Sequence, residues 1–249
     1  MAPPNSGKID LKGQSAIVTG SARGIGRGIA LALAREGADL CLSDLIDTHE
    51  TATAVRSYGK RAIENRCDVS HKDDVRSMVD QTIDAFGKID ILISCAAICH
   101  RTHIKDLSEE EWDEELAVNL KGTFLVVQAV LPRMKERNYG KIVCLGSVAG
   151  KVGGLISGPH YVASKGGIHA FIKWVAKDAA AHSVYVNGIA PGPVETEMTR
   201  GFPYSAGMVA LKRLGTTEDI AEAALFLSSQ ASNWITGMVL DVNGGMTMN

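Results

Sequence analysis

Short apolar runs alternate along this chain with segments in which apolar residues recur at the spacing of a helix. Six runs have the length and composition of buried strands, namely residues 16–18, 40–42, 89–94, 141–145, 184–189 and 238–242. Helical spacing occurs in residues 25–33, 75–83 and 161–179, and Ser108-Glu-Glu-Glu111 is a capping-box signature that opens a further long helix. Strands separated by helices indicate an α/β fold, with a parallel sheet covered by helices on both faces.

The sequence shows no composition break, low-complexity linker or internal repeat. Residues 1–12 are polar and contain proline, so we expect a flexible N-terminal arm. The remaining residues, 13–249, are predicted to form a single doubly wound domain.

Composition argues against several classes of function. The net charge is −2 and no block is rich in Lys or Arg, so neither a nucleic acid nor an anionic membrane is an expected partner. No apolar run reaches transmembrane length and the N-terminus lacks an apolar signal core, which favours a cytoplasmic protein. The five cysteines are Cys41, Cys67, Cys95, Cys99 and Cys144, and no two of them form a CxxC pair, so we expect reduced thiols rather than disulfides. Cys95 and Cys99 are spaced CxxxC, but no second Cys/His pair lies nearby at ligand spacing, so no metal site is expected.

A glycine-rich segment, Thr19–Gly26, follows the first predicted strand and opens the first predicted helix. Glycines let the backbone approach a phosphate closely, and the helix N-terminus supplies unpaired N–H groups and a favourable dipole. A tight turn alone would also use glycines, but the strand–turn–helix context is typical of a dinucleotide-binding site.

Two residues give opposite indications about the dinucleotide. Asp44 ends the second predicted strand, about 20 residues beyond the glycines, where a carboxylate accepts hydrogen bonds from ribose hydroxyls and repels a 2′-phosphate. Arg23 lies inside the turn, where a guanidinium could pair with that phosphate. We give more weight to Asp44, because Arg23 can lie over the adenine or in solvent, and the sequence therefore predicts NAD rather than NADP.

Tyr161 and Lys165 form a YxxxK pair on one face of a predicted helix. The pair follows a strand that ends in Gly146-Ser147, at a carboxyl end of the predicted sheet, where α/β folds bind ligands. A YxxxK pair can easily occur by chance, so we interpret this pair as functional because of its position after a strand end rather than because of its spacing alone.

In this order and at these separations, the motifs resemble the short-chain dehydrogenase/reductase family over residues 12–246. The resemblance implies a sheet of about seven parallel strands in the Rossmann-like order 3-2-1-4-5-6-7. The matching positions are Thr19–Gly26, Asp68-Val69, Asn119, Ser147, Tyr161, Lys165, Pro191-Gly192 and Thr196.

The same resemblance implies a role for each catalytic residue. Tyr161 would exchange a proton with the substrate oxygen while the nicotinamide exchanges a hydride, and Ser147 would hydrogen-bond that oxygen. Lys165 would hold the ribose and lower the pKa of the tyrosine, and Asn119 would support a water that links Lys165 to solvent. The expected cofactor-binding residues are Gly20, Ser21, Arg23, Gly24, Ile25, Gly26, Asp44, Leu45, Asp68, Val69, Ser94, Ala96, Tyr161, Lys165, Pro191, Gly192, Val194 and Thr196.

The chain departs from the family pattern after the fourth strand, where Ser94-Cys95-Ala96-Ala97 stands in place of the usual Asn-Asn-Ala-Gly. We expect this segment to change the fine geometry of the site rather than the class of activity. Substrate contacts are expected from loops at the same edge of the sheet, at Val148, Gly153, His100, Met198 and Phe202. His160, which precedes Tyr161, is interpreted as a helix-start histidine, because adjacent helical residues point about 100° apart.

The sequence thus predicts an oxidoreductase that moves a hydride between NAD(H) and a small secondary alcohol or ketone, such as a polyol, sugar or cyclic alcohol. Two alternatives stay open. One is an NADPH-dependent reductase of 3-oxoacyl thioesters, which Arg23 favours, and the other is a regulator that binds NAD without chemistry. The C-terminal segment, residues 236–245, resembles the family's last strand, and a homotetramer, or a dimer, is expected.

Overall fold

The computed structural model describes residues 9–154 and 156–248, and their fold is built on one parallel sheet. Its strand order is β3-β2-β1-β4-β5-β6-β7, which confirms the predicted seven-stranded topology. The strands are β1 (Ser15–Thr19), β2 (Asp39–Asp44), β3 (Ala62–Arg66), β4 (Ile91–Ser94), β5 (Gly140–Leu145), β6 (Val184–Pro191) and β7 (Val239–Val242).

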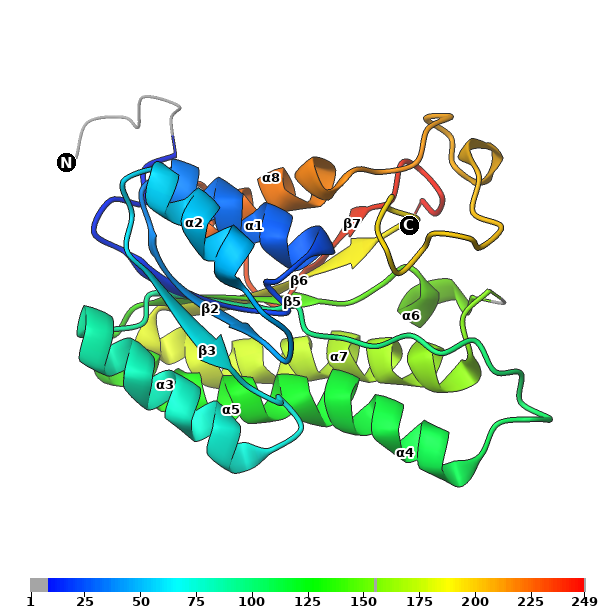
Figure 1. Cartoon of the computed structure of the whole chain (residues 1–249), viewed down its shortest axis with the longest axis horizontal. Helices are drawn as coiled ribbons and strands as arrows, with labels where there is room; N and C mark the ends of the chain where they lie inside the picture. The colour runs from blue at the N-terminus through cyan, green and yellow to red at the C-terminus, as the bar shows by residue number, and fades with distance from the viewer. Residues whose placement is uncertain (1–8, 155, 249) are drawn as a thin grey trace.

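Helices cover both faces of this sheet (Figure 1). One layer holds α1 (Gly24–Arg35), α2 (His49–Ser57) and α8 (Thr217–Ser228). The opposite layer holds α3 (Lys72–Phe86), α5 (Gly122–Glu136) and α7 (Pro159–Ala179). The shorter α4 (Glu109–Leu116) and α6 (Ala149–Val152) lie near the carboxyl ends of the strands. No helix in the described ranges is long and apolar enough to cross a membrane.

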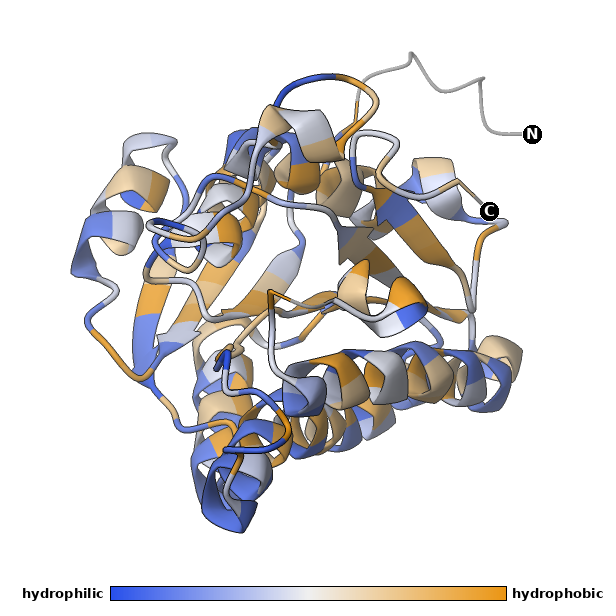
Figure 2. Cartoon of the chain, turned by 90° about the vertical axis from the view of Figure 1, so that its right-hand side faces the viewer, coloured by the Kyte–Doolittle hydropathy of each residue, from blue (hydrophilic) through white to orange (hydrophobic). Residues whose placement is uncertain are grey.

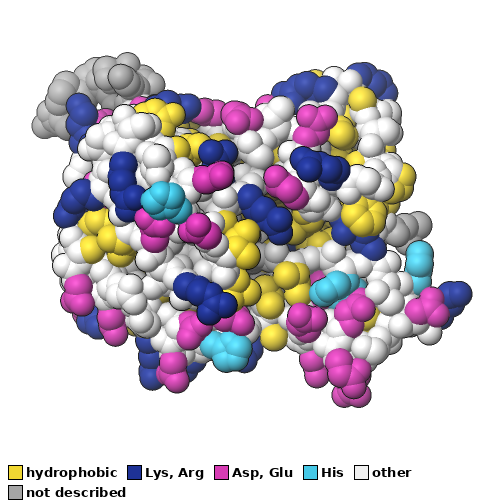
Figure 3. All heavy atoms as spheres, in the orientation of Figure 1, with side chains coloured by type: hydrophobic (Ala, Val, Ile, Leu, Met, Phe, Trp, Pro, Cys, Tyr) yellow, Lys and Arg dark blue, Asp and Glu magenta, His cyan; other side chains and the backbone are white. Residues whose placement is uncertain are grey.

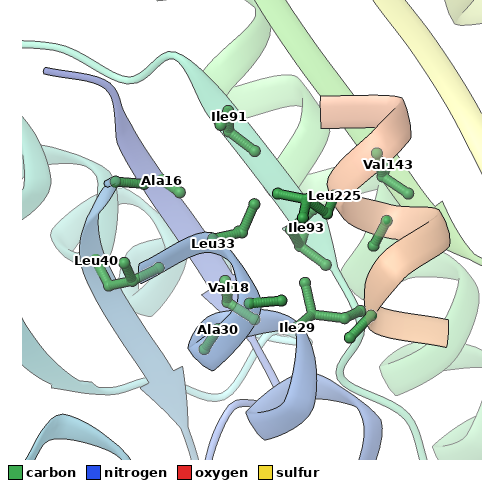
Figure 4. Close-up of a cluster of buried hydrophobic side chains, with 14 of the residues drawn as sticks. Ala16, Val18, Ile29, Ala30, Leu33, Leu40, Ile91, Ile93, Val143 and Leu225 are labelled. Carbon is green, nitrogen blue, oxygen red and sulfur yellow. The ribbon is translucent and has the colours of Figure 1, made fainter. Parts of the chain in front are cut away.

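Two hydrophobic cores hold the three layers together. Figure 4 shows the first, in which Ile29 and Leu33 of α1 and Leu225 of α8 pack on the sheet at Val18 and Ile93. The second core fills the space under α3, α5 and α7. Strands β1, β4 and β5, which lie between the cores, bury both faces and therefore appear in the sequence as continuous apolar runs rather than alternating ones. Figure 2, which looks onto the carboxyl ends of the strands, shows their apolar character.

One strand has no signal in the apolar pattern. Strand β3 has the sequence Ala-Ile-Glu-Asn-Arg and lies at the edge of the sheet, where one side of its ladder faces solvent. Its polar residues fit that position, and only the family resemblance supplied this strand.

The capping signature was read correctly, and the helix behind it has an unexpected break. The Ser108 hydroxyl accepts a hydrogen bond from the Glu111 N–H at 3.1 Å, and α4 begins at the next residue. The helical path then widens into a π-helical segment, Ala117–Lys121, before α5 continues it. Such π segments are rare and occur often at functional sites.

Most of the predicted N-terminal arm, residues 1–12, lies outside the described residues. Its described end is packed rather than loose, because Leu11 is completely buried and its N–H donates to the Glu36 carbonyl at 2.8 Å. The ordered domain therefore begins before residue 13.

Candidate active site

The glycine turn between β1 and α1 is packed so closely that no side chain fits at Gly20 or Gly26. Gly20 has φ +69°, and a Cβ there would lie 2.8 Å from the Ala96 Cα. A Cβ on Gly26 would lie 2.0 Å from the Gly20 carbonyl oxygen. The first turn of α1 consequently presents bare backbone N–H groups, which suits a phosphate.

Asp44 is held beside this turn at the end of β2. Its Oδ2 accepts from the Ala22 N–H at 3.0 Å, and its Oδ1 accepts from the Ile46 N–H at 3.3 Å. A carboxylate has further lone pairs, so Asp44 keeps acceptor capacity for a ribose hydroxyl. Arg23, in contrast, is exposed at the N-cap of α1.

A cavity of about 920 Å³ extends from the glycine turn across the carboxyl ends of the strands. It contains the predicted cofactor positions at one end and the predicted catalytic residues at the other, so its lining fits an extended dinucleotide. The predicted site residues that line it are Gly20, Arg23, Gly24, Ile25, Gly26, Asp44, Leu45, Asp68, Val69, Ala96, Ser147, Val148, Gly153, Tyr161, Lys165, Pro191, Gly192, Val194, Thr196, Met198 and Phe202.

Four predicted site residues do not line this cavity, namely Ser21, Ser94, His100 and Asn119. The two serines support neighbouring segments, since the Ser21 hydroxyl donates to the Ser43 carbonyl and the Ser94 hydroxyl donates to Thr123. Both serines are buried and do not line the cavity, so their predicted contact with the cofactor stays a prediction.

His100, which the sequence predicts to contact substrate, does not line the cavity. Its imidazole turns away from the cavity toward α4, where Nδ1 lies 3.0 Å from Glu115 Oε2. Arg101 takes the cavity position instead. Its guanidinium lies 3.5 Å from the Phe202 ring centroid and donates to the Met198 carbonyl at 2.6 Å, which connects this loop to the segment after β6.

Tyr161, Ser147 and Lys165 meet at the inner end of the cavity. The Lys165 ammonium donates to the Leu145 carbonyl at 2.9 Å and lies 5.5 Å from the Tyr161 ring centroid. Burial raises the pKa of the Tyr161 phenol above its usual value, while the Ser147 hydroxyl acts in the opposite direction. Burial also lowers the pKa of Lys165. In the chain alone, burial outweighs the neighbouring groups and keeps Tyr161 a phenol, the form that can donate a proton to a carbonyl oxygen.

Asn119 is completely buried in the π-helical segment and pairs with the loop after β4. Its Oδ1 accepts from the Ile98 N–H and its Nδ2 donates to the Ile98 carbonyl, both at 2.9 Å. It also donates to the Ser164 hydroxyl at 3.1 Å, on the helix that carries Tyr161 and Lys165. Asn119 thus joins three segments of the site and acts from behind the cavity wall.

The backbone of the unusual Ser94–Ala97 segment is hydrogen-bonded to the strand that precedes the glycine turn. The Cys95 and Ala96 N–H groups donate to the Thr19 hydroxyl at 3.0 and 3.2 Å, next to the glycine turn. Burial raises the pKa of the Cys95 thiol to about 12, so this residue is a neutral, apolar part of the cavity wall.

Sequence reasoning missed His169, which lies under Ser147. Its Nε2 accepts from the Ser147 N–H at 3.4 Å, and a Cβ on Gly146 would lie 2.2 Å from the same nitrogen. The sequence did offer a signal: His169 follows Lys165 by four residues, so the two side chains were expected to share one face of the helix and to lie near the same site.

Comparisons with known proteins agree with this geometry. A family profile described as enoyl-(acyl carrier protein) reductase matches residues 20–247. The chain is 34% identical over 243 residues to the 3-oxoacyl-acyl-carrier-protein reductase FabG of Staphylococcus epidermidis, covering 94% of this chain and 99% of that one. It is 37% identical to an uncharacterized short-chain type dehydrogenase/reductase of Sinorhizobium fredii, with 96% and 99% covered.

A solved structure, that of a short-chain type dehydrogenase/reductase from Mycobacterium marinum, superposes with a TM-score of 0.92 at 32% identity. The superposition covers 96% of this chain and 98% of that one. Likeness of both sequence and fold therefore extends over nearly the whole length of the chain.

Proposed function

The chain belongs to the short-chain dehydrogenase/reductase family of oxidoreductases, and from this premise we propose that it moves a hydride between NAD(H) and a secondary alcohol or ketone. The observation that supports the proposal most directly is the single cavity that joins the glycine turn to Tyr161, Ser147 and Lys165. Bound nicotinamide supplies the centre that accepts or donates the hydride, and the chain supplies the binding site and the proton transfer.

The residues around the cavity suit separate parts of the dinucleotide. The first turn of α1 would bind the pyrophosphate, and Asp44 would accept hydrogen bonds from the adenosine ribose. Asp68 and Val69 would contact the adenine, while the backbone after Pro191 and the side chain of Thr196 would hold the carboxamide end.

Tyr161 is the general acid and base of the proposed reaction. In the reductive direction its phenol donates a proton to the substrate oxygen, and Ser147 hydrogen-bonds that oxygen so that developing charge is stabilised. The Lys165 ammonium would return a proton to the Tyr161 oxygen and would itself be reprotonated from solvent. Asn119 fixes the loop after β4 against the helix that carries Tyr161 and Lys165.

Substitution of Tyr161 by Phe tests the chemistry. Without the phenol hydroxyl, turnover is expected to fall by about 100- to 10,000-fold while NADH binding is retained. Tyr58→Phe, at an exposed position that does not line the cavity, is the control. A panel of secondary alcohols and carbonyl compounds should be assayed with both cofactors; equal rates for the Tyr161→Phe variant and the parent would favour a regulator that binds NAD without chemistry.

A second candidate is a reductase of 3-oxoacyl thioesters that uses NADPH. Relatives at 33–34% identity carry the name of that activity, and the exposed guanidinium of Arg23 could pair with a 2′-phosphate. Steady-state kinetics separate the two candidates, because NADH should be preferred if the Asp44 carboxylate governs the choice. A strong preference for NADPH together with turnover of an acetoacetyl thioester would favour the second candidate.

A further inference from the structure

Four side chains from three separate segments converge behind the catalytic residues. His100 comes from the loop after β4, Glu111 and Glu115 from α4, and His160 from the first turn of α7. His160 Nε2 lies 2.9 Å from Glu115 Oε2 and 3.2 Å from Glu111 Oε1, and His100 Nδ1 lies 3.0 Å from Glu115 Oε2. The proposed hydride transfer uses none of these four groups.

The imidazole of His160 is completely buried, and neither of its ring nitrogens has a hydrogen-bond partner among the described residues. Nε2 is close to two carboxylate oxygens, but its N–H direction is not aligned with either of them. A short N···O distance with a poorly aligned N–H direction makes a weak hydrogen bond, but it is the arrangement expected where a nitrogen and an oxygen bind the same metal ion. The nitrogen lone pair then points at the ion, and neighbouring ligand atoms at about 2.0–2.1 Å from it lie about 3.3 Å apart.

The charges of this cluster also favour a cation. Glu115 is completely buried, and the side chain of Glu111 is 27% exposed. In the described part of the chain, their ion-pair contacts are with imidazoles and not with any Lys or Arg. Burying the Glu115 carboxylate without a Lys or Arg partner is costly. Figure 3 shows that acidic side chains gather over the region of α4, which raises the local concentration of cations.

We propose that His100, Glu111 and His160, whose ligand atoms all lie within 4.8 Å of one another, bind one divalent transition-metal ion, with Zn²⁺ as the best match to two imidazoles and one carboxylate. None of these three ligands lines the cavity, so the ion takes no part in hydride transfer; a water or the neighbouring Glu115 carboxylate would complete the tetrahedron. The partly exposed imidazole of His100 provides the route for entry from solvent.

The ion would influence the geometry of the active site through Glu115, because this carboxylate contacts the imidazoles of His100 and His160 as well as Asn119. Glu115 Oε1 lies 3.4 Å from the Asn119 amide nitrogen, and His160 is adjacent to Tyr161. Binding therefore ties α4 and its π-helical continuation to the start of α7, and it makes the three ligands and Glu115 positioning residues. The sequence analysis predicted no metal site because the cysteines lack ligand spacing. That argument could not detect histidine and glutamate ligands that folding brings together from three separate segments.

Cobalt is the probe for the test, because tetrahedral Co²⁺ absorbs in the visible range. The full chain, freed of metal by chelation and dialysis, is expected to bind one equivalent of Co²⁺ with this absorption and to release it to Zn²⁺. Saturation with Zn²⁺ should raise Tm by about 5 °C. Glu111→Gln and His160→Asn should weaken Co²⁺ binding by at least about 100-fold.

Matched controls lie beside the ligands. Glu110→Gln on the same helix and His103→Asn on the same loop alter exposed side chains and should bind Co²⁺ like the parent. Glu111→Gln keeps the test valid if His160→Asn does not fold, because the Glu111 side chain is at the edge of the cluster. Absence of stoichiometric binding, or equal binding by Glu111→Gln and Glu110→Gln, would overturn the proposal. These readouts do not depend on turnover, so they are separate from the test of hydride transfer.

Discussion

His169 shows how one buried residue links stability to the position of a catalytic group. Burial, reinforced by Lys151 and Lys165, lowers the pKa of His169 to about 4. The unfolded chain titrates near the ordinary value of about 6.5, so between these values the unfolded state binds more protons than the folded state. The stability that comes from a neutral His169 is therefore present above about pH 6.5 and is lost as the pH falls toward 4.

Replacing His169 by Asn should flatten this pH dependence. The parent is expected to lose on the order of 2 kcal/mol of unfolding free energy through this group between pH 7 and pH 4.5, and the variant should not show that loss. Urea unfolding at a series of pH values measures the slope. His103→Asn, at an exposed position, is the control, and an unchanged slope in His169→Asn would contradict the assignment.

Asp44 is the residue that should determine the choice of dinucleotide. Replacement by Ser removes the negative charge that repels a 2′-phosphate and one acceptor for the ribose hydroxyls. We expect kcat/KM with NAD to fall by at least about 10-fold while the value with NADP stays equal or rises. Steady-state kinetics with both cofactors measure the ratio, and a parallel decrease for both would show only a loss of packing at the turn.

Individual residues were predictable where chemistry restricts their type and their place in the chain. Tyr161, Lys165 and Ser147 lie together as expected, because a helical spacing and a strand end determine where they point. His100 and His160 were not predictable. Their imidazoles meet carboxylates of α4, and that contact depends on how a helix formed elsewhere in the chain packs against the loop after β4.

At the scale of elements, the strand–turn–helix unit of β1 and α1 is the most constrained part of the molecule. A methyl group on Gly26 would collide with the Gly20 carbonyl, so Gly26→Ala must displace the turn. The variant is expected to bind NADH at least about 10-fold more weakly, as measured by quenching of NADH fluorescence.

Gly207→Ala provides the comparison for this substitution. A Cβ at Gly207 makes only an ordinary contact, 3.7 Å from the Ser205 hydroxyl oxygen, so NADH affinity should not change. Melting curves of both variants separate a local change from unfolding. Unchanged NADH affinity in Gly26→Ala would place the dinucleotide away from this turn.

Elements were predictable where burial imposes a pattern, and poorly predictable where it does not. Strands β1, β4 and β5 bury both faces and show as apolar runs, whereas β3 at the sheet edge has a polar sequence without periodicity. The π-helical segment around Asn119 adds a residue to a helical turn without changing composition. Hydrophobic spacing alone therefore reads α4 and α5 as one long helix.

At the scale of the whole molecule, the topology followed from the family resemblance, and the assembly remains a prediction. The outer surface of α5 and α7 carries an apolar cluster of Phe124, Phe171 and Trp174. Trp174 is 66% exposed, Phe124 is 39% exposed, and the two phenylalanine rings meet edge to face at 6.3 Å. Contiguous exposed aromatic residues on two adjacent helices are typical of a protein–protein interface.

We expect this aromatic cluster to be covered in a homotetramer, where burial of Trp174 against a second copy would contribute most of the local binding energy. Trp174→Glu places a charge in that contact and should shift the mass measured by light scattering toward dimer or monomer. Tyr58→Glu, which adds the same charge to an exposed aromatic position at the C-terminal cap of α2, should leave the mass unchanged. If Trp174→Glu keeps the parent mass, assembly uses another surface, such as the β7 edge of the sheet.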